Sequence, residues 1–126
     1  MPKQIIETAH APSPIGPYSQ AVKVNGFVFV SGQIALDQAT GQLVNDTIEA
    51  ETTKVMEHIT AILKEAGLSL ENVVKASIFL SDMDLFARVN KVYGSFFQQD
   101  APARETVEVS RLPKDVNVEI SVIAAA

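Results

Sequence analysis

Apolar residues recur at three- and four-residue steps in two parts of this chain, and each part is predicted to be an amphipathic helix. The first helix covers residues 48–66 and ends at Gly67, because glycine readily adopts the conformation that closes helices. The second is expected to start at a cap on Asp82 or Asp84 and to run to about residue 97. Asn90 lies in its apolar stripe, so we expect its amide to be at least partly buried.

Alternating apolar and polar residues predict strands elsewhere. Residues 21–24 and 27–31 flank Asn25-Gly26, a dipeptide typical of a two-residue hairpin turn with positive φ at both positions. Further strands are expected at residues 5–8, 73–80, 104–109 and 116–124. The order of strands, helix, strand, helix and strands predicts one α+β domain over residues 1–126, with both helices on one face of a mixed sheet. The other face then stays uncovered unless another subunit packs on it.

Two features beside the predicted hairpin are candidate ligand contacts. Residues 12–17 include three prolines, so the loop around them is expected to be extended and stiff, and it presents Tyr18. Gly32 follows the second hairpin strand, at a position where a strand can bulge or admit a ligand close to the backbone.

The last two predicted strands carry the most chemistry. If they pair as a hairpin closed by residues 110–115, Thr106 faces Glu119 and Arg104 faces Ser121. Arg104 and Glu119 then become diagonal neighbours on one polar patch, about 7–8 Å apart. One interpretation is a structural salt bridge, which is the more common outcome for such a spacing. The other is a ligand site, in which the fork of Arg104 binds a carboxylate and Glu119 orients water.

The composition excludes several other classes of protein. The chain of 126 residues has a net charge of −5 and no run of Lys or Arg, which argues against nucleic acid as a main partner. It has no cysteine, so disulfides, thiolate nucleophiles and cysteine-based zinc sites are removed together. No stretch of about 18 apolar residues occurs, so we expect no membrane span and a cytoplasmic protein.

The two histidines do not predict a metal site. His58 falls on the polar side of the first predicted helix, together with Glu51, and is expected to be solvated. His10 lies in the proline-rich loop and has no carboxylate or second histidine at metal-ligand spacing. Lys114 and Arg111, which flank Pro113, are also expected to be solvated.

Several blocks of the sequence, in order, resemble the Rid family of reactive intermediate deaminases, also called YjgF-type proteins. They are APSPIGPYSQA at residues 11–21, FVSGQI at 29–34, APAR at 101–104, VEV at 107–109, RLPKDV at 111–116 and VEI at 118–120. The resemblance implies a chorismate-mutase-like α+β fold and a homotrimer with ligand sites in the clefts between subunits. It also implies hydrolysis of 2-imino acids and enamines, such as 2-iminobutanoate and 2-iminopropanoate, to 2-oxo acids and ammonia, without a cofactor or a metal.

The resemblance also implies roles for individual residues. The family's carboxylate-binding arginine falls on Arg104 and its water-orienting glutamate on Glu119. Its other site positions fall on Tyr18, Ser31, Gly32, Asn90 and Thr106. The family's small residue and cysteine after the arginine are Glu105 and Thr106 here. Glu105 is expected to point away from Arg104, and Thr106 rules out thiol chemistry at its position.

Two classes of function are compatible with these residues. The first is a 2-imino acid and enamine deaminase, and the second is a non-catalytic binder or sensor of small 2-oxo or amino acids. Both use Arg104, but Glu119 favours the enzyme, because a second anion gives a carboxylate sensor no benefit. Ribonuclease activity has been attached to the family, and the acidic composition argues against it.

Overall fold

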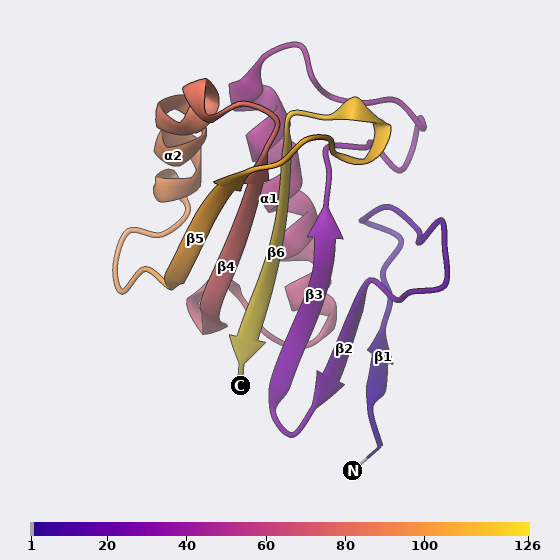
Figure 1. Ribbon diagram of the computed structural model, residues 1–126. Coiled ribbons are helices and arrows are strands. Elements are labelled where there is room, and N and C mark those ends of the chain that lie inside the picture. Colours follow the sequence, from indigo (N-terminus) through magenta and orange to yellow (C-terminus); the bar gives the residue numbers. More distant parts are fainter. Residues whose placement is uncertain (1) are drawn as a thin grey trace.

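The computed structural model describes residues 2–126, which form one six-stranded mixed sheet with two α-helices on one face (Figure 1). The strands are β1 (Gln4–Ile6), β2 (Ala21–Val24), β3 (Phe27–Gln33), β4 (Val73–Leu80), β5 (Ala103–Glu108) and β6 (Val118–Ala125). The α-helices are α1 (Ile48–Glu65) and α2 (Phe86–Ser95), and short 3₁₀ helices cover Leu70–Asn72, Met83–Leu85 and Pro113–Asp115. The predicted α+β fold is confirmed.

The sheet has the strand order β1-β2-β3-β6-β4-β5, with β4 and β5 parallel and the other pairs antiparallel. The prediction that the last two strands form a hairpin is therefore wrong, because β4 lies between β5 and β6. The chain crosses through α2 after β4 and returns beside it as the parallel strand β5, the usual connection for parallel neighbours. Every second residue of β6 is buried and no residue of β5 is, which suits a central and an edge strand respectively.

Local signals place the helices and the hairpin as predicted. Helix α1 is capped by Thr47, whose hydroxyl accepts a hydrogen bond from the amide of Ala50, and it is followed by Gly67 at φ +80°. The hairpin turn has φ values of 51° at Asn25 and 80° at Gly26, the left-handed conformations that the dipeptide favours. Asp82 caps a 3₁₀ turn that leads into α2, and α2 ends at Ser95, slightly earlier than expected.

Two residues predicted on the solvated side of α1 are buried instead. His58 is 1% exposed, and its Nε2 lies 2.7 Å from the carbonyl oxygen of Leu36. Glu51 is fully buried, and its carboxylate accepts hydrogen bonds from the backbone amides of Asn117 and Val118 and from the Asn117 side chain. Helix α1 is thus covered by the sheet on one side, and also by the segments around Leu36 and Asn117. The apolar stripe of the helix does not indicate this additional cover.

The sheet face away from the helices is open in this single chain. Large apolar side chains lie exposed on it, namely Ile5, Phe27, Phe29 and Val107, each between 41% and 50% exposed. Phe27 and Phe29 are neighbours, with ring centres 6.3 Å apart, and exposed apolar side chains that cluster in this way are typical of interaction surfaces. Within residues 2–126, neither α-helix combines the length and the apolar character needed to cross a lipid bilayer.

Candidate functional site

Arg104 lies on the edge strand β5 and points to the helix side of the sheet. It is in register with Ala76 of β4, which is fully buried on that side. Its Nη1 donates a hydrogen bond of 2.7 Å to the Asn90 side-chain oxygen. Its Cζ lies 5.6 Å from the ring centre of Phe86 and 5.1 Å from that of Tyr93. Helix α2 therefore holds the guanidinium.

Asn90 and Thr106 complete this first cluster, which we call the Arg104 group (Asn90, Arg104 and Thr106). Asn90 is exposed, so the expectation of a partly buried amide is wrong. Thr106 follows Arg104 by two residues and shares its side of β5. Its Oγ1 is buried and has no hydrogen-bond partner among residues 2–126. A buried hydroxyl in this state has capacity left for a ligand.

Glu119 points to the opposite, open face of the sheet. It is in register with Phe79 of β4 and alternates with the buried Val118 and Ile120. Its carboxylate lies against the backbone of Gly32, where an added Cβ would be 2.5 Å from Oε2. Burial raises the pKa of the Glu119 carboxyl, and among residues 2–126 no Lys or Arg forms an ion pair with it. Glu119 is therefore a half-buried acid with no counter-ion among the described residues.

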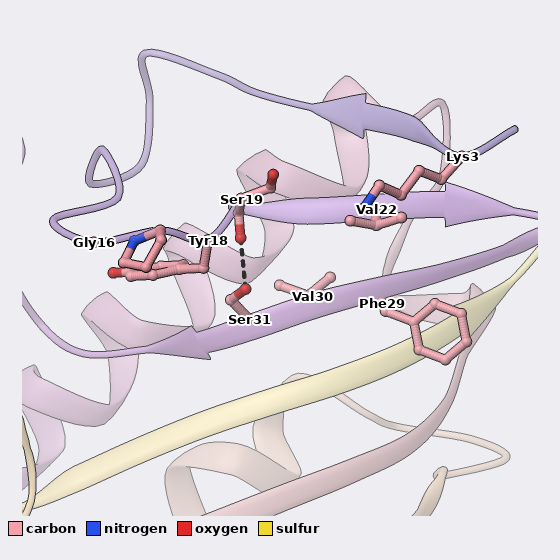
Figure 2. A pocket seen from close by; sticks show the side chains of 9 residues that line it. Lys3, Gly16, Tyr18, Ser19, Val22, Phe29, Val30 and Ser31 are labelled. Carbon is pink, nitrogen blue, oxygen red and sulfur yellow. Dashed lines mark hydrogen bonds between the residues drawn. The ribbon is translucent and has the colours of Figure 1, made fainter.

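Tyr18 and Ser31 lie beside Gly32 on the same face, and together with Glu119 these residues form the Glu119 group (Tyr18, Ser31, Gly32 and Glu119). Ser31 Oγ donates a 2.6 Å hydrogen bond to the carbonyl oxygen of Ser19 (Figure 2). Both Tyr18 and Ser31 line an open hollow of about 600 Å³ (Figure 2). Tyr18 and Gly32 line a second, smaller cavity of about 40 Å³.

Sequence reasoning overlooked Gln20, which anchors the loop that carries Tyr18. Gln20 is 2% exposed; its oxygen accepts from the amide of Thr8, and its Nε2 lies within 3.2 Å of the carbonyl oxygens of Thr8, Ala11 and Pro12. One side chain thus satisfies the backbone of a loop whose prolines cannot donate. A glutamine next to a proline-rich loop and before an apolar strand was the available signal.

The predicted polar patch of Arg104 with Glu119 does not exist within one chain. The two residues lie on opposite faces of the sheet. Their strands are separated by β4, and they align with β4 residues three positions apart, so their backbones are roughly 14 Å apart. The salt-bridge interpretation is excluded for the same reason. The seven predicted site residues instead form two groups on opposite faces of the sheet.

The residues around these groups refine three further expectations. Glu105 points away from Arg104, as predicted, and pairs with Lys75 at 3.0 Å and with Ser77. Arg111 is exposed and pairs with Asp115. Lys114 is exposed but also lines the small cavity with Tyr18 and Gly32, and its backbone has φ 55°. Within residues 2–126, no three His, Asp or Glu side chains gather closely enough to hold a metal ion.

The chemistry available to these groups is anion binding and proton transfer. Arg104 keeps N–H donors in a planar fork beyond the one used by Asn90, which fits a carboxylate. Glu119 can take or return a proton, and its raised pKa brings it closer to neutral pH, where such exchange is most effective.

Comparison with known proteins identifies the family of this chain. The family model described as "Endoribonuclease L-PSP" matches residues 8–126. A RutC family protein of Pyrococcus abyssi is 53% identical over 124 residues, covering 98% of both chains. The chain belongs to the Rid family. A crystal structure from Yersinia pestis, described as the conserved Rid family protein YyfA, has a TM-score of 0.96 and 46% identity, covering 99% of this chain and 100% of that one.

A further Rid-like structure contains a small ligand. The crystal structure of TdcF from E. coli with bound serine has a TM-score of 0.93 and 41% identity, and it covers 98% of both chains. The serine bound in that structure is an amino acid, which carries one carboxylate.

Proposed function

We propose that this Rid protein hydrolyses 2-imino acids and their enamines, such as 2-iminobutanoate and 2-iminopropanoate, to 2-oxo acids and ammonia. The observation that supports the proposal is that the chain presents two chemically complementary groups, which we call half-sites. One offers the guanidinium of Arg104, held by Asn90, with an unpartnered buried hydroxyl on Thr106. The other offers the half-buried carboxylate of Glu119 against Gly32. A 2-imino acid needs both: a cation for its carboxylate and a proton acceptor for the attacking water.

We infer that the half-sites meet between subunits of a homotrimer. Since one sheet separates Arg104 from Glu119 within a chain, only a second copy can bring the Arg104 group against the Glu119 group. The exposed apolar side chains on the open face support this packing, because Phe27 and Phe29 lie on the strand that leads to Ser31 and Gly32. A contact between two different surfaces closes into a ring when its rotation allows, and three copies make the proposed trimer.

In the proposed mechanism, Arg104 binds the substrate carboxylate through two N–H groups, while Asn90 fixes the guanidinium. Glu119 takes a proton from a water molecule as the water oxygen bonds to the carbon of the protonated imine, and the C=N π electrons move to nitrogen. The resulting tetrahedral intermediate carries a hydroxyl and a neutral amine on that carbon. Glu119 returns the proton to the amine nitrogen. Its carboxylate then takes the hydroxyl proton as the C=O bond forms and the C–N bond breaks, so that the 2-oxo acid and ammonia leave and Glu119 releases the proton to solvent. Imines of small acids already react with water, so positioning and proton transfer account for the acceleration.

The proposal is tested by generating imino acids with an L-amino-acid oxidase and trapping them with semicarbazide. The wild-type protein should lower the initial rate of semicarbazone formation, because hydrolysis removes the imine first. Arg104→Ala removes two charge-assisted hydrogen bonds of about 1.5–3 kcal/mol each, so kcat/KM should fall by about 10²- to 10⁴-fold. Arg88→Ala removes an exposed arginine of α2 whose ion-pair partner among residues 2–126 is Glu49, and it should keep wild-type activity.

The same experiment separates the enzyme from a binding protein. If wild-type protein leaves the rate of imine loss unchanged but binds pyruvate through Arg104, the chain is a sensor of small acids and the deaminase proposal is wrong. If Arg104→Ala retains full deaminase activity, the assignment of Arg104 is wrong.

A further inference from the structure

Helix α2 presents three side chains to Arg104 from one side. Phe86, Asn90 and Tyr93 follow one another at steps of four and three residues, so they lie in one row along the helix. The Asn90 oxygen accepts one N–H of the guanidinium, and the rings of Phe86 and Tyr93 lie 5.6 Å and 5.1 Å from its Cζ. All three members of the row thus contact the same cation.

We propose that Phe86 and Tyr93 are positioning residues that hold Arg104 by their ring faces in the orientation that binds a substrate carboxylate. This inference rests on the proposed function, since it assigns to Arg104 the role of carboxylate anchor. A ring face attracts a guanidinium without occupying its N–H groups. The two rings, which we call the Phe86–Tyr93 clamp, therefore restrain the long, flexible side chain of Arg104. They leave its guanidinium N–H groups free for the ligand, apart from the one that bonds to Asn90.

Tyr93 contacts Arg104 through its ring and not through its hydroxyl. Tyr93 is 4% exposed, and its hydroxyl has no hydrogen-bond partner within the part of the chain that the structure describes. Its ring packs against that of Phe97 at a tilt of 44°, with 4.8 Å between centres, and this contact restrains the ring next to Arg104. Burial strengthens the attraction between ring and cation, because water competes less for the guanidinium.

A third aromatic residue near the end of α2 allows the contact with Arg104 to be tested separately from ordinary core packing. Phe96 also packs against the core at the end of α2, but within residues 2–126 the rings that lie over the Arg104 guanidinium are those of Phe86 and Tyr93. Phe96→Leu therefore removes an aromatic ring from the same helix end and serves as the matched control for Tyr93→Leu and Phe86→Leu. Tyr93→Phe keeps the ring and removes the hydroxyl.

The test measures pyruvate and pyruvamide affinity together with kcat and KM for imine hydrolysis. Pyruvamide lacks the carboxylate and serves as the neutral probe. Tyr93→Leu and Phe86→Leu should weaken pyruvate binding by about 2- to 30-fold, the range of one cation–π contact. KM should rise in step while kcat changes little, and pyruvamide binding should stay unchanged. Tyr93→Phe and Phe96→Leu should bind pyruvate as wild type does.

Each alternative outcome overturns a defined part of the inference. If Tyr93→Leu weakens pyruvate and pyruvamide equally, or if Tyr93→Phe is as weak as Tyr93→Leu, the ring does not act through Arg104. If Tyr93→Leu does not fold, Phe86→Leu decides the question alone, because Phe86 is only half-buried. If Arg104→Ala itself binds pyruvate normally, the proposed function fails; if only the ring variants bind normally, the clamp alone is wrong.

Discussion

Replacing Gly32 with alanine should displace the Glu119 carboxylate and leave the fold intact. An added Cβ would lie 2.5 Å from Oε2, 2.9 Å from Cδ and 3.1 Å from Cγ of Glu119. Carbon and oxygen atoms in contact prefer separations of about 3.5 Å or more, so the carboxylate must move by roughly 1 Å. The backbone of Gly32 is outside the left-handed region, unlike that of Gly26, so alanine can adopt its conformation.

A displacement of that size removes the alignment of the catalytic carboxylate. Misplacing a reacting group by about 1 Å lowers rates by about 100-fold, so kcat for imine hydrolysis should fall by that factor in Gly32→Ala. Pyruvate affinity should change by less than about threefold, because Arg104 provides it. Gly94→Ala is the matched control: an added Cβ there meets no atom within 4 Å, so kcat should be unchanged.

A double-mutant cycle makes the reasoning refutable. In the Glu119→Gln background, Gly32→Ala should lower kcat by no more than about twofold further, because both changes act on one carboxylate. A Gly32→Ala protein with wild-type kcat would show that contact between Gly32 and Glu119 does not matter for the reaction. Fully additive effects would show that Gly32 acts through something other than Glu119.

Three further predictions concern stability and pH. Because burial raises the pKa of Glu119, the folded state binds more protons than the unfolded state as pH rises past the ordinary carboxyl value of 4.5. Glu119→Gln should therefore be more stable than wild type at pH 7, and this gain should vanish at pH values below 4.5 in denaturant titrations. Burial lowers the pKa of His58, so wild-type stability should fall as pH drops below 6.5 until the lowered pKa is passed, and His58→Gln should flatten this dependence in thermal melts at several pH values. Glu51→Ala leaves three donors of Asn117 and Val118 without their acceptor and should lower the unfolding free energy in urea by about 3 kcal/mol or more.

Features set by neighbouring residues were predictable from the sequence. The α1 stripe, its stop at Gly67 and the Asn25-Gly26 turn depend on interactions within a few positions, and the structure places all three as expected. Gln20 shows the limit of such reasoning, since its partners Thr8 and Pro12 belong to a loop whose path no local pattern specifies.

Features set by strand order were not predictable in the same way. Adjacent strands along the chain were assumed to pair, and that assumption put Arg104 beside Glu119. The observed order inserts β4 between them, and each residue then follows the pleat of its own strand to a different face. The prediction that Glu51 and His58 are solvated was wrong for a related reason, because segments distant in sequence cover their side of α1. The family resemblance named the site residues without showing which of them share a face.

Subunit complementation tests most directly the central claim that two chains build each site. Arg104→Ala and Glu119→Gln subunits, each inactive alone, are mixed in equal amounts, denatured together and refolded. In a ring with random order, about one quarter of the interfaces join an intact Arg104 group to an intact Glu119 group. The mixture should therefore recover about one quarter of the wild-type rate of imine hydrolysis. A refolded mixture as inactive as its parents would contradict the claim, because it would place the whole site within one chain.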